Sequence, residues 1–91
     1  MRFEWSPEKT AANLAKHKVS FNEARTVFGD RLAVTIDDPD SSTDENRLQA
    51  NGMSQRWRLL VVAHTYDDDV IRIISARRAT KNERRQYESE G

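Results

Sequence analysis

The sequence of 91 residues contains no cysteine, only three glycines and two prolines, and no long apolar run. Without cysteine the chain can form neither a disulfide framework nor a thiolate zinc site, and two histidines alone do not make a typical structural metal site. The longest strongly apolar run, residues 59–63, is far too short to cross a bilayer, and no apolar signal segment follows the first basic residue. We therefore expect a soluble, cytoplasmic protein without a cofactor.

Charge of one sign does not predominate either, since the formal net charge is zero. A neutral total argues mildly against a general nucleic-acid binder, but the charges are unevenly placed. Residues 37–45 carry five acidic side chains and no basic one, whereas residues 72–85 carry six basic side chains against one acidic. A basic working face is one explanation of this pattern. An acidic loop and a solvated helix face explain it equally well.

The length of the chain suits one domain spanning residues 1–91. Two helices are expected near its start. Ser6 and Pro7 are typical first residues of a helix, which we expect to extend to about residue 16. Ser20 and Glu23 have the spacing of a capping box before a second helix with an apolar face. Gly29 is suited to end that helix in a left-handed turn.

From residue 32 onward the apolar residues alternate, which is typical of strands. We expect strands over residues 32–37, 46–53, 57–66 and 70–76, in addition to a short strand at 3–5, with an exposed loop over 37–44. Thr80 and Glu83 form a further capping box that opens a C-terminal helix reaching about residue 89. The order β-α-α-β-β-β-β-α predicts an α+β domain with an antiparallel sheet of about four strands and the helices on one face.

The turn at residues 67–69 permits a geometric prediction about two chemically active side chains. If those three residues form the loop, Tyr66 pairs with Val70, and His64 lies directly opposite Arg72. A two-residue or four-residue loop would move His64 away. Two simpler interpretations remain open: Arg72 forms an ion pair with Glu45 or an aspartate and closes the sheet, and His64 is a structural histidine.

Metal-free cleavage of RNA needs a base, cations that stabilise the phosphorane, and an acid for the leaving oxygen. Histidine, glutamate and tyrosine can move the protons, and arginine supplies the positive charge. The sequence offers such a set, although many unrelated sequences would too: His64, Glu45, Arg47, Arg72, Arg77 and Tyr87. An unpaired base could stack on Trp57 or Tyr66. For Trp57, however, packing in the core or at a sheet edge is the favoured expectation.

Motifs spread from Phe3 to Tyr87, nearly the whole chain, resemble those of the BrnT toxins. They are Phe3-Glu4-Trp5-x-Pro7-x-Lys9, Asn13, Lys16-His17-x-Val19-Ser20-Phe21, Ala24, Val27-Phe28, Glu45-x-Arg47, Gly52, Arg72-Ile73-Ile74-Ser75-Ala76-Arg77-x-Ala79 and Glu83-Arg84-x-x-Tyr87. The arginine-bounded Ile-Ile-Ser-Ala segment is the most specific of them, and the N-terminal motif supports the resemblance independently.

The resemblance implies a RelE-like fold and the function of a type II toxin, an endoribonuclease that cleaves mRNA and inhibits translation without a metal cofactor. It also implies a BrnA-type antitoxin partner whose ribbon-helix-helix domain binds operator DNA. For the assembly two alternatives stay open, a homodimer and a heterotetramer with the antitoxin. By position it suggests the catalytic residues Glu45, Arg47, Arg72 and Arg77 and the substrate-binding residues Lys16, His17 and Tyr87. Arg78 is added to the latter group for its charge, and His64 to the former on the geometric argument alone.

An alternative from another class is a non-catalytic module, such as an inactive toxin remnant, that binds RNA or protein through the basic C-terminal face. The chain also departs from the BrnT pattern at one telling position. Lys18 stands where the family usually has glycine, so a left-handed helix end there would cost roughly 1 kcal/mol. Ser6 replaces the usual aspartate, and both residues cap helices well.

Overall fold

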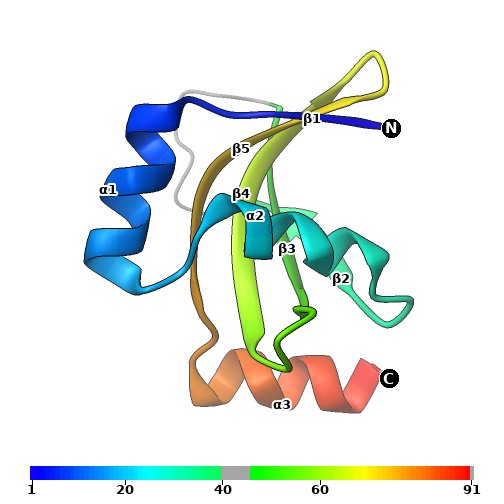
Figure 1. The fold of residues 1–91 in the computed structure, drawn as a ribbon. Coiled ribbons are helices and arrows are strands. Elements are labelled where there is room, and N and C mark those ends of the chain that lie inside the picture. Colours follow the sequence, from blue (N-terminus) through cyan, green and yellow to red (C-terminus); the bar gives the residue numbers. More distant parts are fainter. Residues whose placement is uncertain (40–45, 91) are drawn as a thin grey trace.

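The computed structural model describes residues 1–39 and 46–90, and it contains three α-helices, one 3₁₀-helix and five strands within them (Figure 1). The expected element order is present, and the α+β class is confirmed. In chain order the elements are β1 (Arg2–Glu4), α1 (Pro7–His17), α2 (Phe21–Arg25), η1 (Thr26–Gly29), β2 (Val34–Asp37), β3 (Arg47–Met53), β4 (Leu59–Asp67), β5 (Val70–Arg78) and α3 (Lys81–Glu90). Most of the loop expected over 37–44 lies outside the described residues.

The strands form a single sheet in the order β1-β5-β4-β3-β2. Strands β2 to β5 are antiparallel neighbours, as the short connections predict. The first strand differs from that expectation, because β1 joins the edge of the sheet parallel to β5. Its apolar Phe3 stacks on Phe28 with ring centroids 5.4 Å apart, so burial of this side chain draws the three-residue strand onto the sheet.

The first helix begins and ends as the sequence suggests. Ser6 caps it by accepting a hydrogen bond from the backbone of Lys9, and Pro7 is its first residue. It ends at Lys18, which has a left-handed backbone with φ 62° and donates its N–H to Leu14. The lysine thus adopts the conformation that favours glycine, and the expected strain is present.

The second helix differs from its prediction in two ways. Ser20 accepts a hydrogen bond from the Glu23 N–H, but the Glu23 carboxylate turns to Arg58 instead of back to the cap. The capping box is therefore only half formed, because a strong cation competes for the carboxylate. Gly29 does not adopt a positive φ, since the chain leaves α2 through the tighter η1 helix instead of a left-handed turn.

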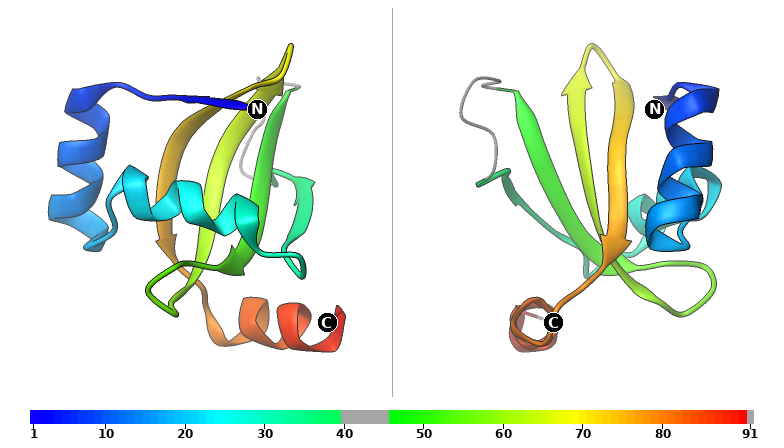
Figure 2. Two further views of the ribbon diagram at one scale, coloured as in Figure 1. Left: turned by 45° about the vertical axis from the view of Figure 1, so that its right-hand side comes forward. Right: turned by 90° about the vertical axis from the view of Figure 1, so that its left-hand side faces the viewer.

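One face of the sheet is packed against α1, α2 and η1 (Figure 2), and we call it the covered face. Its core contains Val19, Phe21, Ala24, Val27, Ala50, Leu60, Val62, Ile71, Ile73 and Ala76. Gly52 shows how closely the layers approach, because a Cβ at this position would lie 2.8 Å from the Ala33 Cβ and 2.9 Å from Val27. Only glycine fits there without displacing η1.

The opposite face, which we call the open face, is defined by the register of the ladders. Its residues include Arg2, Glu4, Val34, Ile36, Arg47, Gln49, Asn51, Met53, Val61, Ala63, Thr65, Asp67, Val70, Arg72, Ser75 and Arg77. The expectation that all helices share one face is wrong for α3, which lies across the end of the sheet (Figure 2). It contacts the open face through Asn51 and Arg77, because its own residues are too polar to join the core. No helix in the described part of the chain is long and apolar enough to span a membrane.

Candidate active site on the open face of the sheet

The β4–β5 hairpin has a shorter loop than the sequence analysis assumed. Only Asp68 and Asp69 form it, with φ of 51° and 66°, the pattern of a two-residue type I′ turn. Asp67 therefore pairs with Val70, and the residue opposite Arg72 is Thr65. The prediction that His64 lies opposite Arg72 is wrong, and its cause is a register set by a two-residue loop.

His64 lies on the covered face and is only 1% exposed. Its ring meets the ring of Phe28 edge-on at 4.8 Å, and its Nδ1 is 3.0 Å from the Val62 carbonyl oxygen. Burial lowers the pKa of His64, which favours the neutral ring near pH 7. A residue in this setting packs the core, and a substrate on the open face does not reach it.

The same register gathers the three arginines of the motifs on the open face. Thr65 in β4 pairs with Arg72 on one side and with Arg47 on the other. Their backbones are thus two strand spacings apart, roughly 10 Å. Long guanidinium side chains at that spacing are able to contact adjacent oxygens of one RNA backbone. In the ladder Arg77 stands further along β5, opposite Val61.

A β-bulge makes this gathering possible. Arg72 and Arg77 are five positions apart, an odd separation that places side chains on opposite faces of a regular strand. The β4–β5 register shifts between Ala63 and His64, so that Ile74 is an extra residue in β5. The extra residue restores an even count, and both arginines face the same side.

The arginines differ in how strongly they are already held. Arg77 donates to both oxygens of Glu83, over 2.8 and 2.9 Å, and these bonds help to lower the pKa of Glu83 to about 2. The Arg47 Nε is 2.9 Å from an oxygen of Asp38. Arg72 has a longer contact, 3.6 Å from a guanidinium nitrogen to a carboxylate oxygen of Glu4. Both side chains are about half exposed. Arg72 is therefore the arginine with the weakest protein partner among the three.

Between these arginines the open face has a floor of short side chains, including Ala63 and Ser75, which pair with each other across β4 and β5. A hollow of about 330 Å³ continues from the sheet to α3. Its lining is polar at α3 and apolar at β2, with Val34, Ile36, Pro39, Gln49, Asn51, Thr80, Asn82, Glu83 and Gln86. No cation is among the described residues that line the hollow itself, and Arg47, Arg72 and Arg77 stand on the neighbouring part of the open face, where positive charge suits an extended polyanion.

Tyr87 has a structural contact that the sequence does not reveal. Its hydroxyl donates a 2.6 Å hydrogen bond to Asp30, whose other bonds come from the backbone N–H groups of Leu32 and Met53. Burial and the Asp30 carboxylate raise the pKa of Tyr87 to about 12. Together with the 2.9 Å bond from the Asn51 side chain to the Glu83 carbonyl, this contact fixes α3 to the sheet.

Three further residues suggested for the site, Lys16, His17 and Arg78, do not join the open face. Lys16 and His17 end α1, which packs on the covered side. Arg78 is exposed at the end of β5, paired with Leu60 from the covered face. Glu45 lies outside the described residues. Among the residues that are described, no three His, Cys, Asp or Glu side chains gather in a way that could hold a metal ion.

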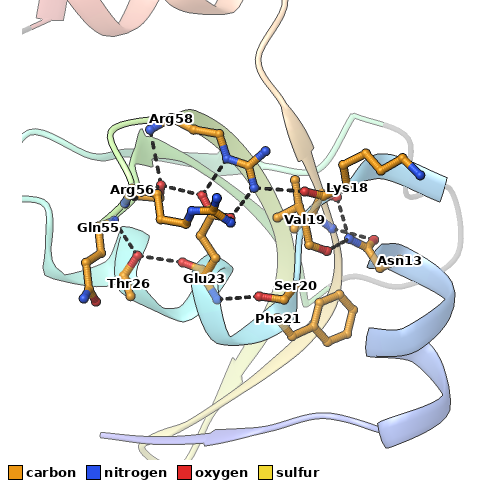
Figure 3. A network of polar contacts seen from close by, with 12 residues as sticks. Asn13, Lys18, Val19, Ser20, Phe21, Glu23, Thr26, Gln55, Arg56 and Arg58 are labelled. Carbon is orange, nitrogen blue, oxygen red and sulfur yellow. Dashed lines mark hydrogen bonds and ion pairs between the residues drawn. The ribbon is translucent and has the colours of Figure 1, made fainter. Parts of the chain in front are cut away.

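Sequence reasoning missed a polar network that fixes the β3–β4 hairpin to the helices (Figure 3). Arg58 binds both oxygens of Glu23, which also accepts a 2.7 Å bond from Ser54, and Arg58 reaches the Lys18 carbonyl at 2.9 Å. The Glu23 side chain is 4% exposed, so the pairing offsets a large desolvation cost. Asn13 plays a similar part, since its side chain binds the backbone of Val19 and of Ala76.

Comparisons with known proteins agree with this architecture. The family model described as "Ribonuclease toxin, BrnT, of type II toxin-antitoxin system" matches residues 5–83. The crystal structure of the Brucella abortus ribonuclease toxin BrnT superposes with a TM-score of 0.67 at 23% identity, covering 89% of this chain and 99% of that one, which shows a shared fold. No curated protein sequence matches the chain. Because the family match extends over most of its length, the chain belongs to the BrnT family of ribonuclease toxins of type II toxin–antitoxin systems.

Proposed function

We propose that this chain is a metal-independent endoribonuclease that cleaves mRNA and so inhibits translation, with the scissile phosphate on the open face. The observation that carries the proposal is the common orientation of Arg47, Arg72 and Arg77, which the ladders and the β-bulge produce. Membership of a ribonuclease toxin family supports the reaction class.

In the proposed reaction the ribose 2′-oxygen attacks the adjacent phosphorus, and its proton passes to a base. The bond from phosphorus to the 5′-oxygen breaks, and that oxygen takes up a proton. The products are a 2′,3′-cyclic phosphate and a 5′-hydroxyl. Negative charge on the phosphoryl oxygens grows in the transition state, where guanidinium groups stabilise it most. Arg72 has the most freedom to do so, because its protein partner is weak and exposed.

The proton acceptor is most simply a carboxylate. The open face carries no histidine among the described residues, and His64 is buried on the other side of the sheet. Glu83 is a poor base, since Arg77 and Thr80 stabilise its charged form and lower its pKa to about 2. We assign the role to Glu45 on the BrnT resemblance, which places it in one motif with Arg47; Glu4, also on the open face, is the carboxylate that lies beside Arg72.

As a type II toxin, the protein has an antitoxin partner. We propose a BrnA-type antitoxin with a ribbon-helix-helix domain, through which the toxin associates indirectly with operator DNA. The end of β5 and the start of α3 present exposed cations, Arg78, Lys81, Arg84 and Arg85, that suit an acidic segment of such a partner. We further propose that the protein acts in the cytoplasm, where its mRNA substrate is found.

The test is cleavage of a synthetic single-stranded RNA by the purified chain in buffer containing EDTA. We expect cleavage with 2′,3′-cyclic phosphate ends, and complete protection when the nucleotide before the cleaved bond is 2′-deoxy. Wild-type protein that binds the RNA and leaves it intact would contradict the proposal and favour the non-catalytic alternative. Loss of cleavage on adding EDTA, with recovery on adding Mg²⁺, would contradict the metal-independent mechanism.

A further inference from the structure

Trp57 stands at the tip of the β3–β4 hairpin with 84% of its surface exposed. The expectation that it packs in the core or at a sheet edge is wrong, because the chain turns before β4 and leaves the side chain outside. Its backbone has φ 62°, a conformation that costs a bulky residue free energy. Both the exposed indole and this backbone conformation cost stability, which is common at sites that bind a partner.

The backbone beneath the indole is firmly held. The Trp57 N–H donates to the Ser54 carbonyl at 2.9 Å, and the Ser54 N–H donates to the Arg58 carbonyl at 2.8 Å. The Gln55 N–H donates to the Thr26 hydroxyl at 2.8 Å, which joins the tip to η1 (Figure 3). An aromatic side chain presented from a fixed backbone loses little conformational entropy on binding.

The surface around the indole is positively charged and hollowed. Three shallow hollows meet at Thr26: Trp57 lines one of them, Arg56 the second, and Arg25 the second and third. Arg25 is exposed, and the Arg56 side chain is 73% exposed, since it only approaches Glu23 at 3.9 Å.

Both carboxylates in these hollows already have strong partners. Glu23 is bound by Arg58 and Ser54, and Asp30 accepts hydrogen bonds from Tyr87 and two backbone N–H groups. The charge of Glu23 is therefore compensated by Arg58, and the oxygens of Asp30 are occupied by neutral donors. The exposed indole of Trp57 and the nearby cations Arg25 and Arg56 complement a ligand that combines flat rings with negative charge.

We propose that Trp57 is a stacking platform for an unpaired base of single-stranded RNA, with Arg25 and Arg56 on the flanking phosphates. This combination of an aromatic face and nearby cations is how proteins hold single strands without reading their sequence. The tip lies at the end of the sheet where Leu60 pairs with Arg78, next in the chain to Arg77. Because Gln55 is bound to Thr26 of η1, the tip lies on the side of the helices, and an RNA strand from the open face reaches it by passing round that end of the sheet. The inference therefore rests on the proposed function and extends its site.

Tyr66, the exposed aromatic residue of the other hairpin, provides a matched control. It is 46% exposed at the far end of β4, and its hydroxyl donates to Asp69. It sits beside the acidic residues Asp67, Asp68 and Asp69, which repel phosphate. Both tips carry an exposed aromatic side chain, Trp57 more exposed than Tyr66, and the local charge differs.

The test measures binding of a fluorescent, 2′-O-methylated single-stranded RNA, which lacks the nucleophilic hydroxyl and is not cleaved. Trp57→Ala is expected to weaken binding about tenfold, as is typical for loss of one stacked base. Trp57→Phe should keep most of the affinity, and Tyr66→Ala all of it. In the ¹H–¹⁵N spectrum the indole signal of Trp57 should move on adding the RNA, and that of Trp5, which packs on Phe21, should not.

Equal affinity of Trp57→Ala and wild type would overturn the inference, while cleavage of unmodified RNA by the wild type would leave the proposed function intact. If wild type neither binds nor cleaves RNA, both fail. Unchanged RNA binding in Trp57→Ala, combined with weaker neutralisation by the antitoxin, would assign the platform to a protein partner and also overturn the inference.

Discussion

The two faces of the sheet are built from the same strands and have opposite chemistry. The covered face carries Leu60, Val62 and Ile73, all at most 1% exposed, and its one titratable ring, His64, is buried with them. The open face carries Arg72 and Arg77 from the same strand as Ile73. Neighbours in sequence therefore pack the core on one side and form the proposed phosphate-binding surface on the other. We therefore expect substitutions on the covered face to alter stability and substitutions on the open face to alter cleavage.

The largest effect is expected on the covered face, from Ile73→Ala. Removing this buried side chain should lower the free energy of unfolding by about 4 kcal/mol, because a cavity remains in the packed layer. This is a large part of the stability of so small a chain. Urea unfolding followed by circular dichroism measures it. The cleavage rate per folded molecule should not change, and a rate that falls with folding fully restored would show that the faces are coupled.

The neighbouring change, Arg72→Ala, should have the opposite signature. We expect cleavage to slow by about 10²-fold, the usual effect of losing one group that stabilises transition-state charge. The free energy of unfolding should stay nearly constant, because the contact of this side chain with Glu4 is long and exposed to solvent. The cleavage rate is measured under single-turnover conditions, with the enzyme in excess over the RNA. Arg31→Ala, at an exposed arginine in the turn before β2, is the control that should cleave normally.

A smaller effect, dependent on pH, is expected where α3 meets the open face. The pKa of Glu83 is lowered to about 2, so its pairing stabilises the fold above the ordinary pKa of 4.5 and loses this contribution as the pH falls towards 2. Glu83→Gln should therefore cost about 2 kcal/mol at pH 7 and little at pH 2. Urea unfolding across this range tests the sign. A cost that does not vary with pH would contradict the assignment to the ionised pair, and Glu88→Gln is the control.

The smallest effect is expected from His64→Leu. The ring is neutral and packed against Phe28, so a leucine of similar volume should change stability by less than about 1.5 kcal/mol. The cleavage rate and the shape of its pH profile should match those of the wild type. A loss of activity as large as that of Arg72→Ala, in a folded protein, would mean that the covered face takes part in the chemistry.

Much of the fold could be predicted from local patterns, because capping residues and alternating apolar residues act over a few positions. Ser6, Pro7 and the Thr80–Glu83 box all behave as the sequence suggests. The parallel docking of β1 was not predictable, since it depends on the contact of Phe3 with Phe28, which are distant in sequence. The half-formed capping box at Ser20 fails for the same reason: Arg58, 35 residues away, takes the Glu23 carboxylate.

The site was harder to predict than the fold. The arginines stand out in the sequence, but their common face depends on the bulge at Ile74 and on a two-residue turn at Asp68 and Asp69. A shift of one residue changes the face of every side chain beyond it, so a small error in loop length misplaced His64. Trp57 was misjudged because an indole usually gains free energy by burial, and only the structure shows a tip held by hydrogen bonds instead.

The central claim is that the strand of RNA to be cleaved lies on the open face of the sheet and not against its covered face, and methyl NMR tests it most directly. The methyl groups of Ala63 and Thr65 face the open side, and those of Leu60 and Val62 face the helices. On titration with 2′-O-methylated RNA we predict large shifts for Ala63 and Thr65 and small ones for Leu60 and Val62. Shifts concentrated on Leu60 and Val62, with Ala63 and Thr65 unmoved, would contradict the account.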